Sequence, residues 1–237
     1  ANEGDALRFP HGMASPGELG KMLRLLRDAG CSEVTLAGRV PRPEFTSLKL
    51  DARGALALPK VIAAAAKGDD ALLRALVDIF EREGFKVVGS ADAARDLLAP
   101  VGPLGLLEPS EQDMADIAYA QQVVAATGAL DVGQSAVVCD GLVLAVEAAE
   151  GTDAMIQRVG TLSEAVRGTA EVRRGVLVKA PKPGQDRRVD LPVIGKRTVE
   201  LASEAGLAGI AAEAGSTLIL NRRVVSEVAD ALGLFVY

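Results

Sequence analysis

Residues 136–146 read Ala-Val-Val-Cys-Asp-Gly-Leu-Val-Leu-Ala-Val, two apolar runs on either side of Asp140-Gly141. Because an Asp-Gly pair readily adopts the positive φ angles of a two-residue turn, this pattern predicts a β-hairpin. A further strand is expected at Val176-Leu-Val178, and a helix from about Gln112 to Thr127. The hairpin and its neighbours therefore predict a mixed α/β domain in the second half of the chain.

The first half of the chain alternates amphipathic helices with short apolar strands. Strands are predicted at residues 33–37 and 85–88, with a helix over about residues 70–83 between them. This alternation predicts a Rossmann-like domain with an open, mainly parallel sheet. Asp69 and Asp70 have the form of a catalytic acid pair, but their place directly before the helix favours capping.

The composition changes between residues 100 and 110, where prolines and glycines interrupt every period. A chain of 237 residues also exceeds the usual size of a single domain. We therefore predict a two-domain α/β protein, with a first domain over residues 1–99, a linker over 100–110 and a second domain over 111–237.

Composition and charge exclude several classes of function. The chain has 26 Lys and Arg against 32 Asp and Glu, 3% aromatic residues and no Trp, which argues against a nucleic-acid-binding protein. With His11 as the sole histidine, a metal would need oxygen ligands, which favours Mg²⁺ or Mn²⁺. The absence of a membrane-length apolar run or a signal peptide, together with only Cys31 and Cys139, predicts a cytoplasmic protein.

A proline-rich loop follows the strand at residues 176–178. Residues 179–195 read Lys-Ala-Pro-Lys-Pro-Gly-Gln-Asp-Arg-Arg-Val-Asp-Leu-Pro-Val-Ile-Gly, which gathers four cations around Asp190. Loops at strand ends are where α/β proteins bind ligands, and clustered Lys and Arg suit phosphate groups. A solvated basic surface loop fits the same residues, so both interpretations stay open.

Two segments around the hairpin carry further candidates. Glu147, Glu150 and Asp153 follow it and could ligate a hard cation, although Thr152 or Asp153 could equally be the N-cap of the next helix. Gln134 precedes the hairpin, where it could contact a ligand or complete an ordinary turn. The residues alone leave these alternatives open.

Six short runs occur in the order found in one known family. They are Asp51-Ala-Arg-Gly54, Lys67-Gly-Asp-Asp70, Met114-Ala-Asp-Ile117, Val146-Glu-Ala-Ala-Glu-Gly-Thr-Asp-Ala-Met155, Lys179-Ala-Pro-Lys-Pro183 and Arg188-Val-Asp-Leu-Pro192. Together they resemble the LpxI family, the UDP-2,3-diacylglucosamine pyrophosphatases of lipid A biosynthesis. The last three runs discriminate most strongly.

The resemblance implies a Mg²⁺-dependent hydrolase that converts UDP-2,3-diacylglucosamine to UMP and 2,3-diacylglucosamine 1-phosphate. It also implies a homodimer formed through the second domain, substrate bound between the domains, and a cytoplasmic enzyme that can contact the inner membrane. Family members begin with a strand and a glycine-rich loop that this chain lacks, so we expect the first domain to be truncated at its start.

The resemblance places the essential aspartate at Asp190, which we assign to catalysis and metal binding, with Glu147 as a second metal ligand. The residues expected to contact substrate are Gly38, Arg39, Gln134, Thr152, Asp153, Lys179, Lys182 and Arg188. Leu104, Leu106 and Leu107 could line a groove for the acyl chains or belong to the core. Two alternative functions are a nucleotide-sugar-binding regulator without hydrolysis and a pyrophosphatase without lipid selectivity.

Overall fold

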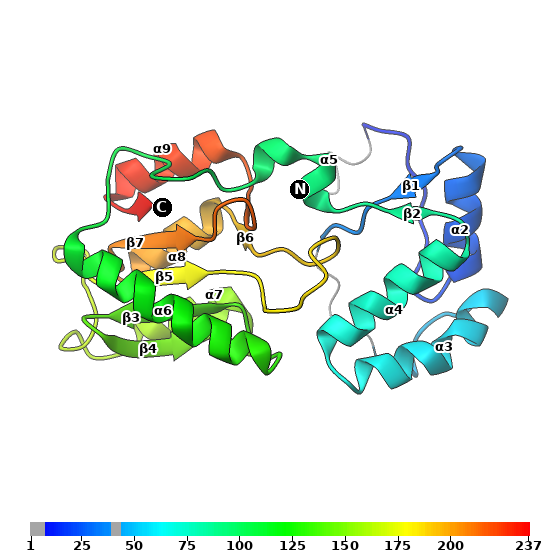
Figure 1. Ribbon diagram of the computed structural model, residues 1–237, viewed down its shortest axis with the longest axis horizontal. Helices are drawn as coiled ribbons and strands as arrows, with labels where there is room; N and C mark the ends of the chain where they lie inside the picture. Colours follow the sequence, from blue (N-terminus) through cyan, green and yellow to red (C-terminus); the bar gives the residue numbers. More distant parts are fainter. Residues whose placement is uncertain (1–7, 39–43) are drawn as a thin grey trace. The chain divides into compact units, whose positions relative to one another are not determined.

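A computed structural model describes residues 8–38 and 44–237 (Figure 1). It forms two compact units, Ala1–Val88 and Gly89–Tyr237, which are described separately. Both combine helices with strands, as the sequence predicts for a two-domain α/β protein. Within the described ranges, no helix combines the length and apolar character needed to cross a membrane.

The first unit packs helices around a small parallel sheet. In its described residues, two strands pair in parallel, Glu33 with Lys86 and Val34 with Val87. Its elements are α2 (Leu19–Asp28), β1 (Glu33–Val34), α3 (Ala52–Ala65), α4 (Asp69–Arg82) and β2 (Lys86–Val87). The parallel pairing is confirmed, but each strand has only two residues, shorter than the runs the sequence predicted.

Two motif residues of this unit serve its helices. The Asp51 carboxylate accepts hydrogen bonds from the backbone N–H groups of Gly54, at 2.8 Å, and Lys21, at 2.9 Å, so it caps α3 and ties it to α2. Helix α4 is preceded by Gly68, whose φ of 125° suits glycine. The predicted capping by Asp69 or Asp70 is wrong in detail, because both acids lie inside the first turn.

The second unit is built on a mixed five-stranded sheet in the order β4-β3-β5-β7-β9. The pairs β4–β3 and β3–β5 are antiparallel, whereas β5–β7 and β7–β9 are parallel. A second, parallel sheet joins β6 to β8. The elements are α5 (Ser90–Ala93), η1 (Arg95–Leu97), α6 (Glu111–Ala129), β3 (Ser135–Cys139), β4 (Leu142–Val146), α7 (Thr152–Gly160), β5 (Val176–Lys179), β6 (Val193–Ile194), α8 (Lys196–Glu204), β7 (Gly209–Ala212), β8 (Leu218–Ile219), α9 (Arg222–Leu232) and β9 (Phe235–Val236).

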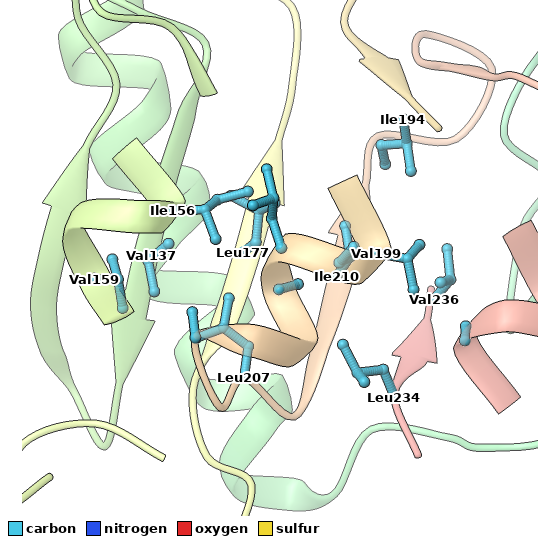
Figure 2. Close-up of a cluster of buried hydrophobic side chains, with 14 of the residues drawn as sticks. Val137, Ile156, Val159, Leu177, Ile194, Val199, Leu207, Ile210, Leu234 and Val236 are labelled. Atoms are coloured by element: carbon cyan, nitrogen blue, oxygen red, sulfur yellow. The ribbon is translucent and has the colours of Figure 1, made fainter. Parts of the chain in front are cut away.

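Hydrophobic clusters cover both faces of the five-stranded sheet, because alternate residues of each strand point to opposite faces. The larger cluster joins one face to α7, α8 and α9 (Figure 2), and it includes Val137, Ile156, Leu177, Leu207, Ile210 and Leu234. The smaller cluster joins the other face to α6, and it includes Ile117, Val124, Ala136, Val138, Val176 and Val178. We call these the α7 face and the α6 face.

The predicted hairpin is confirmed and is anchored by a buried acid from α6. Asp140 and Gly141 adopt φ angles of 51° and 76°, as expected for a two-residue Asp-Gly turn. Asp116, with 1% of its surface exposed, accepts hydrogen bonds from both of their backbone N–H groups at 2.8 Å. This buried contact explains the aspartate in the run Met114-Ala-Asp-Ile117 as a structural residue.

The segment predicted as a linker packs on the second unit. The Leu104 N–H donates to the Val236 carbonyl at 2.8 Å, and the Leu106 N–H donates to Asp230 Oδ1 at 2.7 Å. Leu104 packs against the larger core, whereas the Leu106 side chain is 85% exposed and Leu107 is 41% exposed. The proline-rich composition reflects irregular backbone that packs on this unit, and the two compact units divide after residue 88.

Candidate functional site

Strand register brings several polar residues of the second unit together at one end of the strands of the five-stranded sheet. Ser135, the first residue of β3, pairs with Lys179, the last residue of β5, and Lys179 pairs with Ala212 at the end of β7. Glu147 follows β4, and its N–H donates to the Ser135 carbonyl at 2.9 Å. The carboxyl ends of β5 and β7 therefore meet the loop of residues 180–192, which carries Asp190. We call this segment the Asp190 loop.

Asp190 is partly buried and is held by a neighbour from its own loop. The Gln185 Nε2 donates to Asp190 Oδ2, and the Gln185 Oε1 accepts from the Lys182 N–H at 2.8 Å. Burial raises the pKa of Asp190; Lys182 and Lys179 oppose this increase, and Glu147 adds to it. A carboxylate with a raised pKa that faces cations has the properties of a general base.

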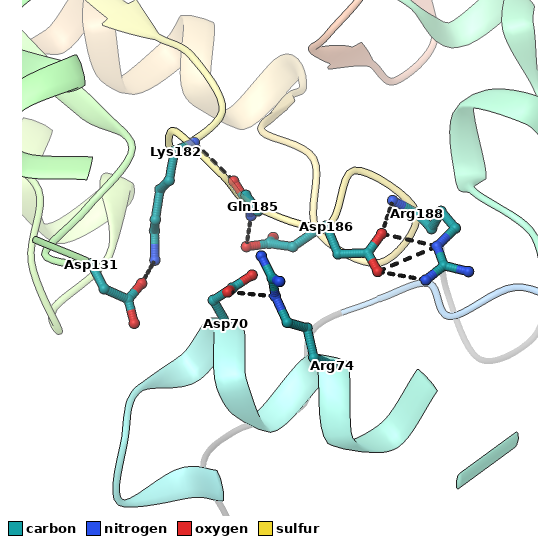
Figure 3. A network of polar contacts seen from close by, with 8 residues as sticks. Asp70, Arg74, Asp131, Lys182, Gln185, Asp186 and Arg188 are labelled. Atoms are coloured by element: carbon teal, nitrogen blue, oxygen red, sulfur yellow. Dashed lines mark hydrogen bonds and ion pairs between the residues drawn. The ribbon is translucent and has the colours of Figure 1, made fainter. Parts of the chain in front are cut away.

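The other cations of the loop have acidic partners. Lys182 Nζ contacts Asp131 Oδ1 at 2.6 Å (Figure 3), with only 13% of the lysine side chain exposed. Arg188 contacts Asp186 at 2.7 Å, also shown in Figure 3. Arg187 is more exposed and contacts the carboxylate of Glu213 at 3.4 Å and the hydroxyl of Ser216 at 3.0 Å. A phosphate that binds these cations therefore has to share or displace their acidic partners.

Lys179 differs from these cations because its side chain is buried, with 5% of the residue exposed. Its Nζ donates to Thr152 Oγ1 at 2.8 Å and to the Val193 carbonyl at 3.1 Å. Burial lowers the pKa of Lys179, an effect opposed by the charges of Glu147, Asp153 and Asp190. The predicted direct contact with substrate phosphate does not fit this position, because the strand turns the side chain into the α7 face.

Thr152 and Glu147 take part in the same buried contacts. Thr152 Oγ1 donates to Glu147 Oε1 at 2.9 Å, and Ser135 Oγ donates to Glu147 Oε2. The proposed capping role of Thr152 or Asp153 is wrong, because the N-cap of α7 is Gly151, with φ of 81°. Asp153 lies exposed in the first turn of the helix.

The remaining predicted site residues are less connected. Gln134 Oε1 is buried and has no hydrogen-bond partner within the described parts of the chain, which leaves an acceptor for a ligand or water. Gly38, with φ of 99°, belongs to the first unit, so its place relative to Asp190 is not described. Arg39 lies outside the described residues. His11 is exposed in the first unit.

A cavity of about 470 Å³ lies on the α6 face beside the Asp190 loop. Its apolar wall comes from α6, β5 and the loop, and its polar lining includes Gln185 and Arg187. The apolar lining residues are Val124, Ala125, Val178, Ala180, Pro181 and Pro183. Gln185 lines the cavity and also donates a hydrogen bond to Asp190, so this one side chain connects the cavity with the candidate reacting group.

Sequence reasoning missed Gln185, Asp131 and Ser135 as parts of this site. Gln185 and Asp131 lie in loops whose residues carry no periodic signal. Ser135 lies inside an apolar strand, where only the pairing with Lys179 reveals its role. Glu147 was predicted as a metal ligand, but both of its carboxylate oxygens accept hydrogen bonds from hydroxyl groups. Across residues 8–38 and 44–237, no group of three His, Cys, Asp or Glu side chains forms a metal cluster.

The fold and site define a two-unit α/β protein. A carboxylate and several cations follow the carboxyl ends of parallel strands in its mixed sheet, an arrangement suited to phosphate chemistry. Family models for the LpxI N-terminal domain and the LpxI C-terminal domain match residues 2–97 and 100–237. The chain belongs to the LpxI family. It is 54% identical over 229 residues to the UDP-2,3-diacylglucosamine pyrophosphatase LpxI of Caulobacter vibrioides, covering 97% of this chain and 82% of that protein.

Proposed function

We propose that the protein hydrolyses the pyrophosphate bond of UDP-2,3-diacylglucosamine, giving UMP and 2,3-diacylglucosamine 1-phosphate in lipid A biosynthesis. The observation that carries this proposal is the 54% identity, along 97% of the chain, to a protein named for that pyrophosphatase activity. The site agrees with the proposal, because Asp190 lies among cations in a loop at the strand ends.

Asp190 is the proposed general base. Its Oδ1 accepts a proton from the attacking water while the water oxygen bonds to phosphorus and the bridging P–O bond breaks. Gln185 fixes the carboxylate through Oδ2, which leaves Oδ1 for the water. Lys182 and Arg188 offset the charge of the phosphate oxygens, with Arg188 able to hold two oxygens at once.

In an alternative role, Asp190 Oδ1 would hold Mg²⁺, or Mn²⁺ in its place, and the ion rather than the carboxylate would then activate the water. Mg²⁺ is usually held by one or two protein carboxylates together with substrate phosphates and waters, so a single acid suffices. Such an ion would neutralise phosphate charge during hydrolysis. Glu147 fits this role poorly, because its two oxygens already accept hydrogen bonds from Ser135 and Thr152.

The cavity on the α6 face is the proposed site for an acyl chain. Its apolar wall suits a hydrocarbon, and Lys182 and Arg187 of the Asp190 loop also line it, so the phosphates would lie beside them. This cavity takes the acyl-chain role that was considered for the leucines of residues 104–107, since Leu104 packs into the core and Leu106 faces solvent.

The test is turnover of UDP-2,3-diacylglucosamine by the full chain, with Mg²⁺ and with EDTA, beside UDP-glucosamine that carries no acyl chains. We expect metal-dependent release of UMP from the acylated substrate and a much lower rate without the acyl chains. Binding without release would favour the nucleotide-sugar-binding regulator. Equal rates on the two substrates would favour a pyrophosphatase without lipid selectivity.

The proposal extends to the setting of the reaction. An enzyme for a diacylated substrate has to meet that lipid at a membrane surface, so we place this one in the cytoplasm, in contact with the inner membrane. Family membership is the separate ground on which we propose a homodimer. Co-sedimentation with lipid vesicles and sedimentation equilibrium test these two points. A monomer that does not co-sediment with vesicles would overturn both points without affecting the assignment of the reaction.

A further inference from the structure

Four polar side chains form a continuous buried network on the α7 face. They come from the start of β3, the end of β4, the first residue of α7 and the end of β5. The exposed fractions of Ser135, Glu147 and Lys179 are 1%, 8% and 5%, and Thr152 is partly buried. Hydrogen bonds run from Ser135 and Thr152 to Glu147, and from Lys179 to Thr152.

Thr152 is the link between the two charges of the network. A threonine hydroxyl has one proton to donate and two lone pairs to accept with. Its proton is committed to Glu147 Oε1 at 2.9 Å, so the Lys179 ammonium at 2.8 Å donates to the remaining lone pair. Glu147 therefore stabilises the buried charge of Lys179 through one hydroxyl.

The network reaches the Asp190 loop through a backbone carbonyl. Strand β6 directly follows this loop, and its ladder with β8 uses the carbonyls of Pro192 and Ile194 as acceptors for Leu218 and Leu220. Because carbonyls alternate in direction along a strand, the intervening carbonyl of Val193 points away from β8. Lys179 Nζ donates to that carbonyl at 3.1 Å.

This bond fixes the chain close to the reacting group. Val193 lies three residues after Asp190, and the two residues between them, Leu191 and Pro192, are buried. The Asp190 side chain itself is held by Gln185 from the same loop. Lys179 is thus the anchor of the backbone that follows Asp190.

We propose that Ser135, Glu147, Thr152 and Lys179 form a positioning network that holds Asp190 in place for hydrolysis, acting through the Val193 carbonyl and without touching substrate. The inference rests on the proposed function and replaces the expected phosphate-binding role of Lys179. A misplacement of about 1 Å at a reacting group can cost about 100-fold in rate. An anchor three residues from Asp190 is therefore expected to affect the rate of hydrolysis.

The first test is Thr152→Val, which keeps the shape of the side chain and removes the linking hydroxyl. We expect kcat to fall by about 10- to 100-fold, with KM for the substrate changed by less than about 2-fold. Thr152→Ser restores the hydroxyl and should recover kcat to within about 3-fold of the unmodified protein. Thr161→Val is the matched control, because Thr161 lies at the other end of α7 and its hydroxyl donates to the Arg158 carbonyl rather than to the network; its kinetics should not change.

A second variant covers the case in which Thr152→Val fails to fold. Ser135→Ala removes the other hydrogen bond to Glu147 and leaves Thr152 and Lys179 in contact. It should lower kcat in the same direction but by less, again with KM unchanged. Circular dichroism and thermal melting confirm that each variant is folded before its kinetics are compared.

Several results would overturn the network. One is a raised KM with unchanged kcat, because a group that binds substrate uniformly behaves in that way. Others are unchanged kinetics in Thr152→Val, failure of Thr152→Ser to recover kcat, or a much higher Mg²⁺ requirement, which would make Glu147 a metal ligand. If the unmodified chain releases no UMP, the proposed function fails and the network fails with it; if only the variants behave unexpectedly, the network alone fails.

Discussion

Lys179 and Lys182 lie three residues apart in the chain, yet the structure uses them in opposite ways. Lys179 is the last residue of β5 and donates to neutral oxygens inside the α7 face. Lys182 lies beyond Pro181 and contacts Asp131 directly at 2.6 Å. The comparison teaches that two lysines of one basic segment differ in role: Lys179 fixes the Asp190 loop from the end of β5, and Lys182 can exchange Asp131 for a phosphate.

The largest effect is expected for Lys179→Met. It leaves Glu147 buried without its cation and frees the Val193 carbonyl, so we expect a loss of about 3 kcal/mol in the free energy of unfolding. In the protein that remains folded, kcat should fall by about 100-fold with little change in KM. Urea unfolding and steady-state kinetics measure both, and a stable variant with a raised KM would assign Lys179 to the phosphate instead.

Lys182→Gln should show the reverse pattern. Its ion pair with Asp131 leaves 13% of the lysine and 31% of the aspartate side chain exposed, so the free energy of unfolding should fall by only about 1 kcal/mol. Loss of a phosphate contact should raise KM by about 10-fold, with a smaller change in kcat. Urea unfolding and steady-state kinetics again measure both quantities. A marked loss of stability with a normal KM would show that Lys182, like Lys179, has a structural role.

A smaller effect is expected from filling the cavity on the α6 face. Ala125→Phe adds a ring to its wall and should raise KM for UDP-2,3-diacylglucosamine by about 5-fold, without affecting the unfolding temperature much. Ala126→Phe is the control, since Ala126 is also exposed on α6 but does not line the cavity. Equal KM values for the two variants would remove the acyl chain from this cavity.

The smallest effect concerns the pH dependence of stability. Because burial raises the pKa of Asp190, the folded state releases this proton less readily than the unfolded state, and stability falls as the pH rises from about 3.9 through the folded pKa. Asp190→Asn removes this penalty, so its melting temperature should exceed that of the unmodified chain by about 2–4 °C at pH 7. The gain should disappear below about pH 3.9; a gain that persists there would have another cause.

Local signals predicted the parts of the fold that depend on neighbouring residues. The hairpin at residues 136–146 follows from the Asp-Gly turn, and α6 was predicted to within two residues at each end. The prolines and glycines of residues 100–110 report irregular backbone and say nothing about where that backbone packs. The bonds of Leu104 and Leu106 to β9 and α9 join residues more than a hundred positions apart.

The sequence predicted which residues belong to the site more successfully than it predicted their contacts. Asp190 and its cations were found from one loop, but their acidic partners Asp131 and Glu213 come from distant segments. One signal for Lys179 was available in the sequence. It shares strand parity with the buried Leu177, which places its side chain on the core side of β5.

The most direct test of the central claim is release of UMP from UDP-2,3-diacylglucosamine by Asp190→Asn, compared with the unmodified chain at saturating Mg²⁺. Asparagine keeps an oxygen for the Gln185 hydrogen bond and removes the basic carboxylate. The predicted result is a rate lower by about 1,000-fold or more in a protein that is folded and at least as stable. A folded variant that retains a rate within about 2-fold of the unmodified chain would contradict the assignment of Asp190 as the reacting group.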